Sequence, residues 1–250
     1  MKIDKYVFEK LRLYLAIKRG VEFVKINRGP LKGYLWTPTT DFYRYCLGIH
    51  EVHLSTSLVS NLKSDSVFYD LGANAGYYSL IASTKIDEGA IYGFEPVDKS
   101  IKYFRAHLVK NQITNVEIIS KGISDSCKEI YFTATDHISG NGYKNIQDEP
   151  KDLLKVDCLS IDSFVEEYRA KPPTIIKIDI EGAELDALKG SENTLKEFRP
   201  LIYLATHDDI VPNITRECIE FLERLGYTVN QSGDEKDSKG QFDFICKYEG

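Results

Sequence analysis

The 250-residue sequence predicts an α/β protein built around a mostly parallel β-sheet. From residue 66 onward, short apolar stretches alternate with helical patterns, which is typical of right-handed β-α-β units. A glycine-rich turn at residues 72–76 follows the first apolar stretch and opens a helical pattern. Residues 1–62 look helical and irregular, so we expect an N-terminal helical cap over 1–62 and the main domain over 63–250.

Each element follows from its local pattern. Apolar runs of strand length predict strands over residues 67–71, 90–95, 116–119, 174–179, 200–206, 227–229 and 242–246. Helical periodicity predicts helices over 77–82, 98–111 and 159–169, through Leu185 and Leu188, and from Cys218 to Leu225. Residues 123–133 are expected to be extended, as a strand or a hairpin. The Gly/Asn/Asp-rich residues 135–152 are expected to form a substrate-recognition loop.

Composition excludes several classes of protein. Apolar residues make up 42% of the chain and charged residues 28%, as in folded globular proteins and unlike disordered ones. No apolar run approaches the ~20 residues that a membrane-spanning helix needs, and we see no secretory signal. The net charge of −6 argues against a nucleic-acid partner. Five scattered cysteines without metal-ligand spacing favour a reduced, cytoplasmic protein.

The first twenty residues are basic, with six Lys/Arg against two Asp/Glu. Within them, Phe8, Leu11 and Leu15 recur at helical spacing. We expect this helix to pack on the body of the protein with its basic side chains in solvent. Contact with a membrane surface is the alternative.

The strongest local motif is the turn Asp70-Leu-Gly72-Ala-Asn74-Ala-Gly76. Gly72 and Gly76 allow the backbone to approach a ligand, which a Cβ would hinder. The turn is neither G-x-G-x-x-G nor a P-loop. Asp70 beside it disfavours a phosphate, which binds best at a helix N-terminus without a nearby anion. S-adenosylmethionine suits such a site, because it carries a sulfonium and an ammonium group and no phosphate.

A second acid completes the predicted nucleoside site. Glu95 follows Gly76 by 19 residues and ends the second predicted strand. A carboxylate at this point can accept hydrogen bonds from both ribose hydroxyls. Pro96 ends the strand and biases Glu95 toward an extended backbone.

Four sequence blocks stand out together. They are Leu47-Gly-Ile-His-Glu51, Phe68-Tyr-Asp-Leu-Gly-Ala-Asn-Ala-Gly-Tyr-Tyr-Ser79, Gly93-Phe-Glu-Pro96, and Ile176-Lys-Ile-Asp-Ile-Glu-Gly-Ala-Glu184 running on to Leu188-Lys-Gly190. With these blocks the chain resembles the FkbM-like family of S-adenosylmethionine-dependent methyltransferases over roughly residues 46–230. The resemblance implies a Rossmann-like, seven-stranded class I methyltransferase fold and methyl transfer, commonly to a hydroxyl oxygen. It implies cofactor contacts from Asp70, Gly72, Asn74, Gly76 and Glu95.

Five further residues are expected at the cofactor. They are Glu51, Ala73, Tyr77, Pro96 and Ile123. Tyr77 opens the first helix of the main domain, where an aromatic ring can pack on the cofactor. Ile123 begins the extended segment that we expect to supply an apolar wall for adenine.

Asp179 and His207 are the predicted catalytic residues. Asp179 ends the fourth strand among apolar neighbours, where it could position the substrate, contact the cofactor amine or hold a metal. Transfer to a hydroxyl requires removal of its proton, and His207, after the fifth strand, is the preferred base. We expect His107 to be solvated in mid-helix, and His137 lies in the predicted loop. No metal is expected, because we find no second cluster of carboxylates.

We therefore expect an S-adenosylmethionine-dependent O-methyltransferase that acts on a small molecule, a sugar or a lipid-linked glycan. Members of the family often have an acid near the end of the fifth strand, where this chain has Leu204-Ala-Thr-His207. A non-catalytic S-adenosylmethionine-binding module of the same fold therefore stays open as an alternative. A nicotinamide-dependent dehydrogenase is a further, less favoured alternative.

Overall fold

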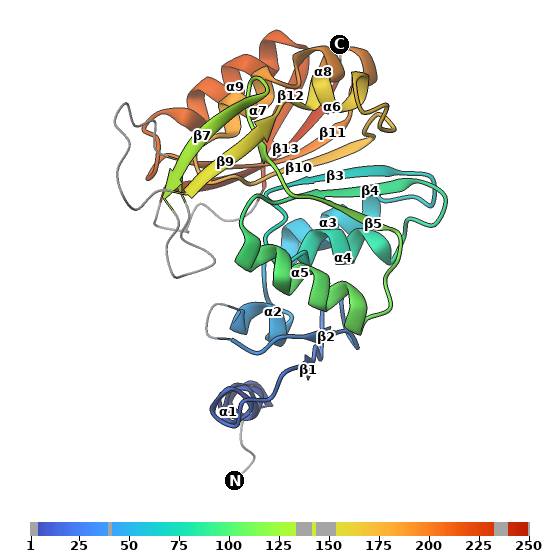
Figure 1. Cartoon of the computed structure of the whole chain (residues 1–250), viewed down its shortest axis with the longest axis vertical. Helices are drawn as coiled ribbons and strands as arrows, with labels where there is room; N and C mark the ends of the chain where they lie inside the picture. The colour runs from blue at the N-terminus through green and yellow to red at the C-terminus, as the bar shows by residue number, and fades with distance from the viewer. Residues whose placement is uncertain (1–4, 40–41, 134–141, 144–153, 233–239, 250) are drawn as a thin grey trace.

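A computed structural model describes residues 5–39, 42–133, 142–143, 154–232 and 240–249 (Figure 1). Its helices are α1 (Lys5–Lys18), α2 (Tyr43–Leu47), α3 (Val52–Asn61), α4 (Tyr77–Ser83), α5 (Asp98–Lys110), α6 (Ile161–Glu166), α7 (Glu184–Lys189), α8 (Glu192–Phe198) and α9 (Ile214–Arg224). Its strands are β1 (Val24–Lys25), β2 (Leu35–Trp36), β3 (Val67–Leu71), β4 (Ala90–Phe94), β5 (Val116–Ile119), β6 (Gly122–Ile123), β7 (Lys128–Thr133), β8 (Gly142–Tyr143), β9 (Leu154–Leu159), β10 (Ile175–Ile178), β11 (Leu201–His207), β12 (Tyr227–Gln231) and β13 (Gln241–Tyr248).

The central sheet has seven strands in the order β12-β13-β11-β10-β3-β4-β5. Strand β13 is antiparallel to both of its neighbours, and the strands from β11 to β5 run parallel. The predicted α/β fold with a mostly parallel, seven-stranded sheet is therefore confirmed. The register places Asp70 of β3 beside Lys177 of β10 on one side and Gly93 of β4 on the other.

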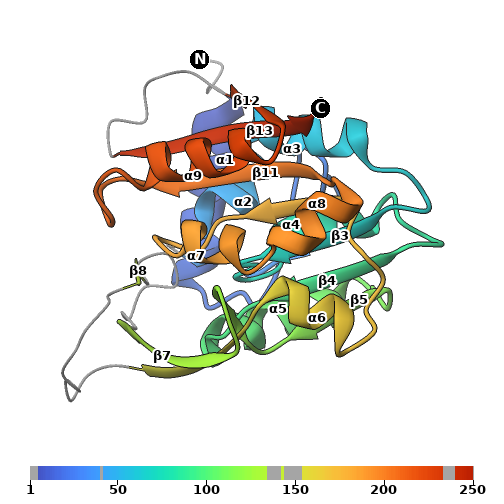
Figure 2. The ribbon, with the colours of Figure 1, turned by 90° about the horizontal axis from the view of Figure 1, so that it is seen from above.

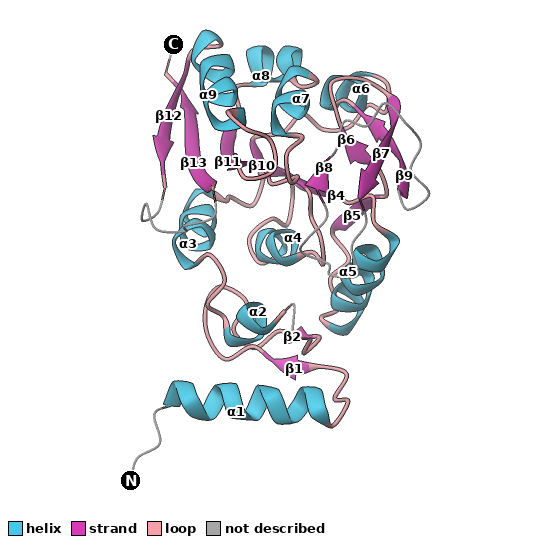
Figure 3. Cartoon of the chain, turned by 90° about the vertical axis from the view of Figure 1, so that its left-hand side faces the viewer, coloured by secondary structure: helices cyan, strands magenta, loops and turns pink. Residues whose placement is uncertain are grey.

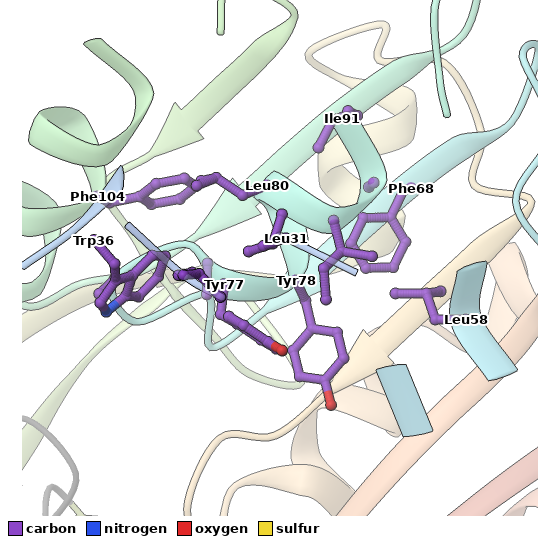
Figure 4. Packing of buried hydrophobic residues seen from close by; sticks show 14 of the residues in the cluster. Leu31, Trp36, Leu58, Phe68, Tyr77, Tyr78, Leu80, Ile91 and Phe104 are labelled. Atoms are coloured by element: carbon purple, nitrogen blue, oxygen red, sulfur yellow. The ribbon is translucent and has the colours of Figure 1, made fainter. Parts of the chain in front are cut away.

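Helices cover both faces of this sheet. Helices α3, α4 and α5 lie on one face and α6 to α9 on the other (Figure 3). In β3, Phe68 belongs to one hydrophobic core with Leu80 and Phe104 (Figure 4), whereas Tyr69 and Leu71 belong to the other. Because both faces are covered, the parallel strands appear in the sequence as continuous apolar runs.

The N-terminal segment shares a core with the main domain. Trp36 packs in the same cluster as Phe68 (Figure 4). Helix α3 is also tied to the sheet, because Tyr203 Oη lies 3.1 Å from Ser57 Oγ and accepts a hydrogen bond from Asn61 at 3.0 Å. One hydrophobic core thus crosses residue 62, and the division into a cap and a domain stays a prediction.

Helix α1 packs on the rest of the protein with a different face from the one expected. Leu13 and Ala16 are buried, while Phe8, Leu11 and Leu15 are exposed by 57%, 51% and 39%. The apolar stripe that helical spacing picks out therefore faces outward instead of packing on the body. None of the described helices is long and apolar enough to cross a membrane.

Strands β6 to β9 form a further sheet, in the order β6-β9-β7-β8. All four strands are labelled in Figure 3, and Figure 2 shows β7 and β8 from above. Within residues 123–133 the chain is extended as expected, but β6 and β7 do not form a hairpin. Strand β9 lies between them, parallel to β6 and antiparallel to β7. Apart from β8, the predicted loop over 135–152 lies outside the described residues, and so does His137.

Candidate active site

The carboxyl ends of β3, β4 and β10 meet at one edge of the central sheet, where open α/β folds bind their ligands. A cavity at this edge encloses about 1020 Å³ of atom-free space, open solvent included. The predicted site residues that line it are Gly72, Ala73, Asn74, Tyr77, Glu95, Pro96, Ile123 and Asp179. Those that do not line it are Glu51, Asp70, Gly76 and His207.

The turn after β3 depends on Gly72. Its φ of +81° lies in the left-handed region, and a Cβ would come within 2.0 Å of the Asp179 carbonyl oxygen. The amides of Gly72 and Ala73 both donate to the Phe94 carbonyl oxygen, at 3.0 and 2.9 Å. The turn is therefore pressed against β10 and tied to β4, which leaves its small residues at the cavity wall.

Gly76 has a different role from the one predicted. It does not line the cavity, and a Cβ on it would lie 2.1 Å from the Phe104 ring. Its φ is +88°. The absence of a side chain at Gly76 thus allows α5 to pack against the start of α4, rather than allowing a ligand to approach.

Glu95 is held by the backbone around it. Its carboxylate accepts hydrogen bonds from the amides of Asn74 and Val97, both at 2.8 Å. Burial raises the pKa of Glu95 to about 7, against the lowering effect of these two hydrogen bonds. Each carboxylate oxygen keeps a lone pair for a further donor. Glu95 is therefore fixed at the cavity wall in a position to accept hydrogen bonds from a diol.

Asp70 does not contact the cavity, contrary to the prediction. Its side chain is buried behind the turn, where one oxygen accepts from Ser79 Oγ at 2.7 Å. The other oxygen has no hydrogen-bond partner within the described part of the chain. Burial raises the pKa of Asp70, although the neighbouring Lys177 lowers it. Asp70 therefore influences the site electrostatically rather than by contact, and it does so in part by raising the pKa of Lys177.

Lys177 is a site residue to which sequence reasoning assigned no role, although its spacing from Asp179 places both on one face of the strand. It lines the cavity, donates to Asp179 Oδ2 at 2.9 Å and lies 4.7 Å from the centre of the Tyr78 ring. Burial lowers its pKa, but Asp179, Asp70 and Glu51 together raise it above the ordinary value. A lysine inside an apolar strand, two residues from Asp179, was the available signal.

Asp179 faces the cavity as an anion. Burial raises its pKa, but the positive charges of Lys177 and His207 more than offset this and lower it below its ordinary value. Glu51, by contrast, lies behind the wall, where it accepts a hydrogen bond from the Tyr78 hydroxyl and lies 3.2 Å from His50 Nε2. His50, not Glu51, reaches the cavity.

His107 is buried rather than solvated, which corrects the prediction. Its Nδ1 lies 2.9 Å from the Ala75 carbonyl oxygen, and its Nε2 accepts from the Thr37 amide at 3.1 Å. The ring stacks on Trp36 with centroids 3.8 Å apart. Burial lowers the pKa of His107 to about 4. The neutral ring thus joins the glycine turn to the aromatic wall of the cavity.

His207 is poorly suited to be the base. Its Nδ1 lies 2.7 Å from Glu184 Oε1, and its Nε2 faces Asp179 and Glu181. Burial lowers the pKa of His207, but these three carboxylates raise it to about 9 in total. An imidazole that holds a proton at neutral pH cannot take one from an acceptor hydroxyl, and His207 does not line the cavity.

The comparisons with known proteins indicate a family of methyltransferases. The family model described as "Methyltransferase FkbM domain" matches residues 70–229. Hexuronic acid methyltransferase AglP of Haloferax volcanii is 30% identical over 139 residues, which are 56% of this chain and 55% of that protein. Methyltransferase sdnD of Sordaria araneosa is 25% identical over 204 residues, 69% of this chain and 78% of that protein.

Solved structures share the fold. Methyltransferase FkbM of Methylobacillus flagellatus has a TM-score of 0.52 at 18% identity, over 82% of this chain and 52% of that one. A Streptococcus mutans protein in complex with SAH has a TM-score of 0.51 at 12% identity, over 77% of this chain and 94% of that one. The chain thus spans about half the length of the Haloferax and Methylobacillus proteins.

Proposed function

The chain belongs to the FkbM methyltransferase family, and from this premise we propose that it transfers the methyl group of S-adenosylmethionine to a hydroxyl oxygen of a sugar or similar small acceptor. One observation carries the proposal. A turn of small residues and a fixed carboxylate, Glu95, line the same cavity as the anionic Asp179. This combination suits a nucleoside that bears positive charge.

The residues present fit S-adenosylmethionine part by part. A Cβ at Gly72 would overlap the backbone of Asp179, so the cradle requires glycine there. Glu95 is placed to accept hydrogen bonds from the ribose hydroxyls. Ile123, Ile130 and Val156 line one side of the cavity as an apolar wall for adenine. The negative charge of Asp179 at the cavity wall would favour the positively charged methionine end.

When bound, the cofactor supplies a methyl group activated on a sulfonium. The protein then has to align the acceptor oxygen with that group and exclude water. Trp36, Tyr45 and Tyr77 line the cavity and pack edge-to-face or stacked against one another, with centroids 4.9 to 5.9 Å apart. We assign the exclusion of water to this aromatic wall, and the placement of the acceptor to the Asp179 side of the cavity.

A sugar is the acceptor class that we favour. The relative from Haloferax volcanii is named for methylation of a hexuronic acid. Lys121 also lines the cavity, but it lies beside the proposed adenine wall and 3.9 Å from Asp157, so the name of that relative alone supports this acceptor class. A sugar acid, free or as part of a lipid-linked glycan, is therefore the first acceptor to test. Neither the non-catalytic alternative nor the dehydrogenase alternative gains support from the family match.

Two measurements test the proposal. Trp36 is the single tryptophan and lines the cavity, so its fluorescence should change on addition of S-adenosylmethionine or S-adenosylhomocysteine and not of NADH. Transfer of labelled methyl should then be detected with uronic-acid glycosides and be weaker with the matched neutral glycosides. Binding of NADH, or of neither nucleoside, would contradict the proposed cofactor. Binding of S-adenosylmethionine without transfer to any acceptor would favour the non-catalytic module.

A further inference from the structure

An acidic residue pair and a histidine meet at the carboxyl edge of β10 and β11. His207 Nε2 lies 3.6 Å from Asp179 Oδ1 and 4.0 Å from Glu181 Oε2. All three ligand-type atoms lie within 4.8 Å of one another. We propose that Asp179, Glu181 and His207 form a binding site for a divalent transition-metal ion at the wall of the cavity.

The spacing suits a shared cation better than direct contacts. Hydrogen bonds between these atoms would be about 2.7–3.2 Å long, so 3.6 and 4.0 Å are too long. Ligands that hold one zinc-sized ion at about 2.0–2.2 Å in tetrahedral geometry lie about 3.4 Å from each other. A small inward movement of the two carboxylates therefore brings all three atoms to coordination distance.

Glu184 supplies an independent observation. It is fully buried, and its Oε1 lies 2.7 Å from His207 Nδ1 while it accepts from the Gly182 amide at 2.9 Å. His207 therefore donates from Nδ1 and directs Nε2 toward Asp179 and Glu181. Metal-binding histidines are commonly oriented in this way, with the second ring nitrogen donating to a carboxylate. Nε2 makes no hydrogen bond to any described residue.

Both carboxylates have an oxygen available to coordinate the ion. Lys177 donates to Oδ2 of Asp179, which leaves Oδ1 directed at His207. Glu181 lines the cavity, and its side chain is 35% exposed. Two carboxylates with one imidazole suit Mn²⁺ or Zn²⁺ better than Ca²⁺ or Mg²⁺, which prefer oxygen ligands throughout. Three protein ligands leave positions open for water or an acceptor.

The metal site would activate the acceptor hydroxyl, which His207 cannot do from its place outside the cavity lining. If the proposed function holds, an acceptor hydroxyl on the open position of the ion would have a lowered pKa. Its proton would pass to water as the new C–O bond forms and the S–CH₃ bond breaks, with neutral S-adenosylhomocysteine as the second product. The positively charged cluster of ion and Lys177 would then stabilise the developing oxyanion.

Mn²⁺ binding to the chelator-treated chain tests the site. Binding is monitored through the paramagnetic signal of the free ion, which falls as the ion binds. We expect saturable binding that Glu181→Gln weakens about tenfold or more. The control Glu220→Gln, on the exposed face of α9, should bind Mn²⁺ like the wild type. Zn²⁺ should displace the bound Mn²⁺. Absence of Mn²⁺ binding, or equal binding in Glu181→Gln, would overturn the metal site.

Cofactor binding separates this result from the proposed function. Trp36 fluorescence should still respond to S-adenosylmethionine in the metal-free protein. A response without any Mn²⁺ binding would reject the metal site and leave the methyltransferase proposal standing. Mn²⁺ binding without a response to the cofactor would support the metal site and contradict the proposed cofactor.

A second surface is supported by different observations. Helix α1 lies at one end of the molecule, opposite α6 to α9 (Figures 1 and 3). Its outer face and the segment after it expose the large apolar side chains Val7, Phe8, Leu11, Tyr14, Leu15 and Val21. We infer that this face docks on an anionic lipid surface.

Charge favours a lipid surface as the partner. The described exposed charges on α1 are Lys10, Arg12 and Lys18, with Arg19 directly after, and all are cationic. Glu22, the exposed acid next to Val21, lies 3.8 Å from Lys110 of α5. Glu9, the acid among the described side chains of α1, is buried against Arg28. An apolar stripe flanked by basic side chains suits the boundary between acyl chains and anionic headgroups. If the acceptor is a lipid-linked glycan, this contact brings the cavity to its substrate.

Vesicle co-sedimentation of the full chain tests the surface. Binding should occur with phosphatidylcholine containing phosphatidylglycerol, fall with added salt and be weak with phosphatidylcholine alone. Phe8→Ser should reduce it severalfold. Tyr168→Ser is the matched control, since the two rings are 57% and 58% exposed and Tyr168 follows soon after α6, which lies at the other end of the molecule from α1 (Figure 3). Equal binding by Phe8→Ser, or a dimer that Phe8→Ser dissociates, would overturn the lipid surface.

Discussion

Replacement of Gly76 by alanine separates packing from ligand binding at the glycine turn. The new Cβ would lie 2.1 Å from the ring of Phe104, in a residue whose φ is +88°. A left-handed backbone costs a non-glycine residue ~1–2 kcal/mol. Overpacking of a tight core costs a further ~1–3 kcal/mol. We therefore expect Gly76→Ala to lower the free energy of unfolding by about 2–5 kcal/mol, a large part of the ~5–15 kcal/mol typical of a domain.

Urea unfolding at equilibrium measures this loss, and a second substitution assigns its cause. Phe104→Leu removes ring atoms that the new Cβ would meet, so the double variant should be less destabilised than the two single variants added together, by ~1 kcal/mol or more. Cofactor affinity of folded Gly76→Ala should stay close to that of the wild type, because Gly76 does not line the cavity. Unchanged stability with lost cofactor affinity would refute the packing argument and restore the role first expected of Gly76.

Three further predictions follow from neighbouring residues. Gly72→Ala, whose Cβ would meet the Asp179 carbonyl at 2.0 Å, should lower both stability and cofactor affinity in urea and fluorescence titrations. Glu95→Gln should weaken cofactor binding by ~1–3 kcal/mol. In the wild type, affinity should rise as pH increases through about 7, where Glu95 ionises, and this rise should be absent in Glu95→Gln calorimetry. The pKa of His107 is lowered to about 4, so its contribution to stability is present above pH 6.5 and is lost as pH falls toward 4. The change in unfolding free energy between pH 7 and 4.5, measured in urea, should differ between the wild type and His107→Gln by roughly 2–3 kcal/mol, with the wild type losing more.

Local patterns in the sequence were sufficient for the fold. Strand β3 has the residues expected of it, and the α4 and α5 helices match within a residue or two. These elements are buried on both faces or amphipathic, so their periodicity is visible in single stretches of chain. The handedness of parallel connections predicted a mostly parallel sheet, whereas the order of its strands comes from the structure.

The features that sequence reasoning missed depend on contacts between distant segments. His107 is neutral and buried because Thr37, seventy residues earlier, meets its ring. Strand β9 separates β6 from β7, although those two strands are close in sequence. Helix α1 buries Leu13 and Ala16 because of where the body meets it, and helical spacing alone does not reveal that side.

The charge state of His207 shows why a residue's chemistry is harder to predict than its position. Its place at the end of β11 was expected, and a histidine at that edge suggests a base. Glu181 lies in the turn after β10 and Glu184 begins α7, and only the folded chain brings them to the imidazole. With carboxylates on both ring nitrogens, His207 is better suited to hold a cation, a proton or a metal ion, than to accept a proton from substrate. If the proposed metal site holds, removal of the acceptor's proton would depend on the ion between His207, Asp179 and Glu181.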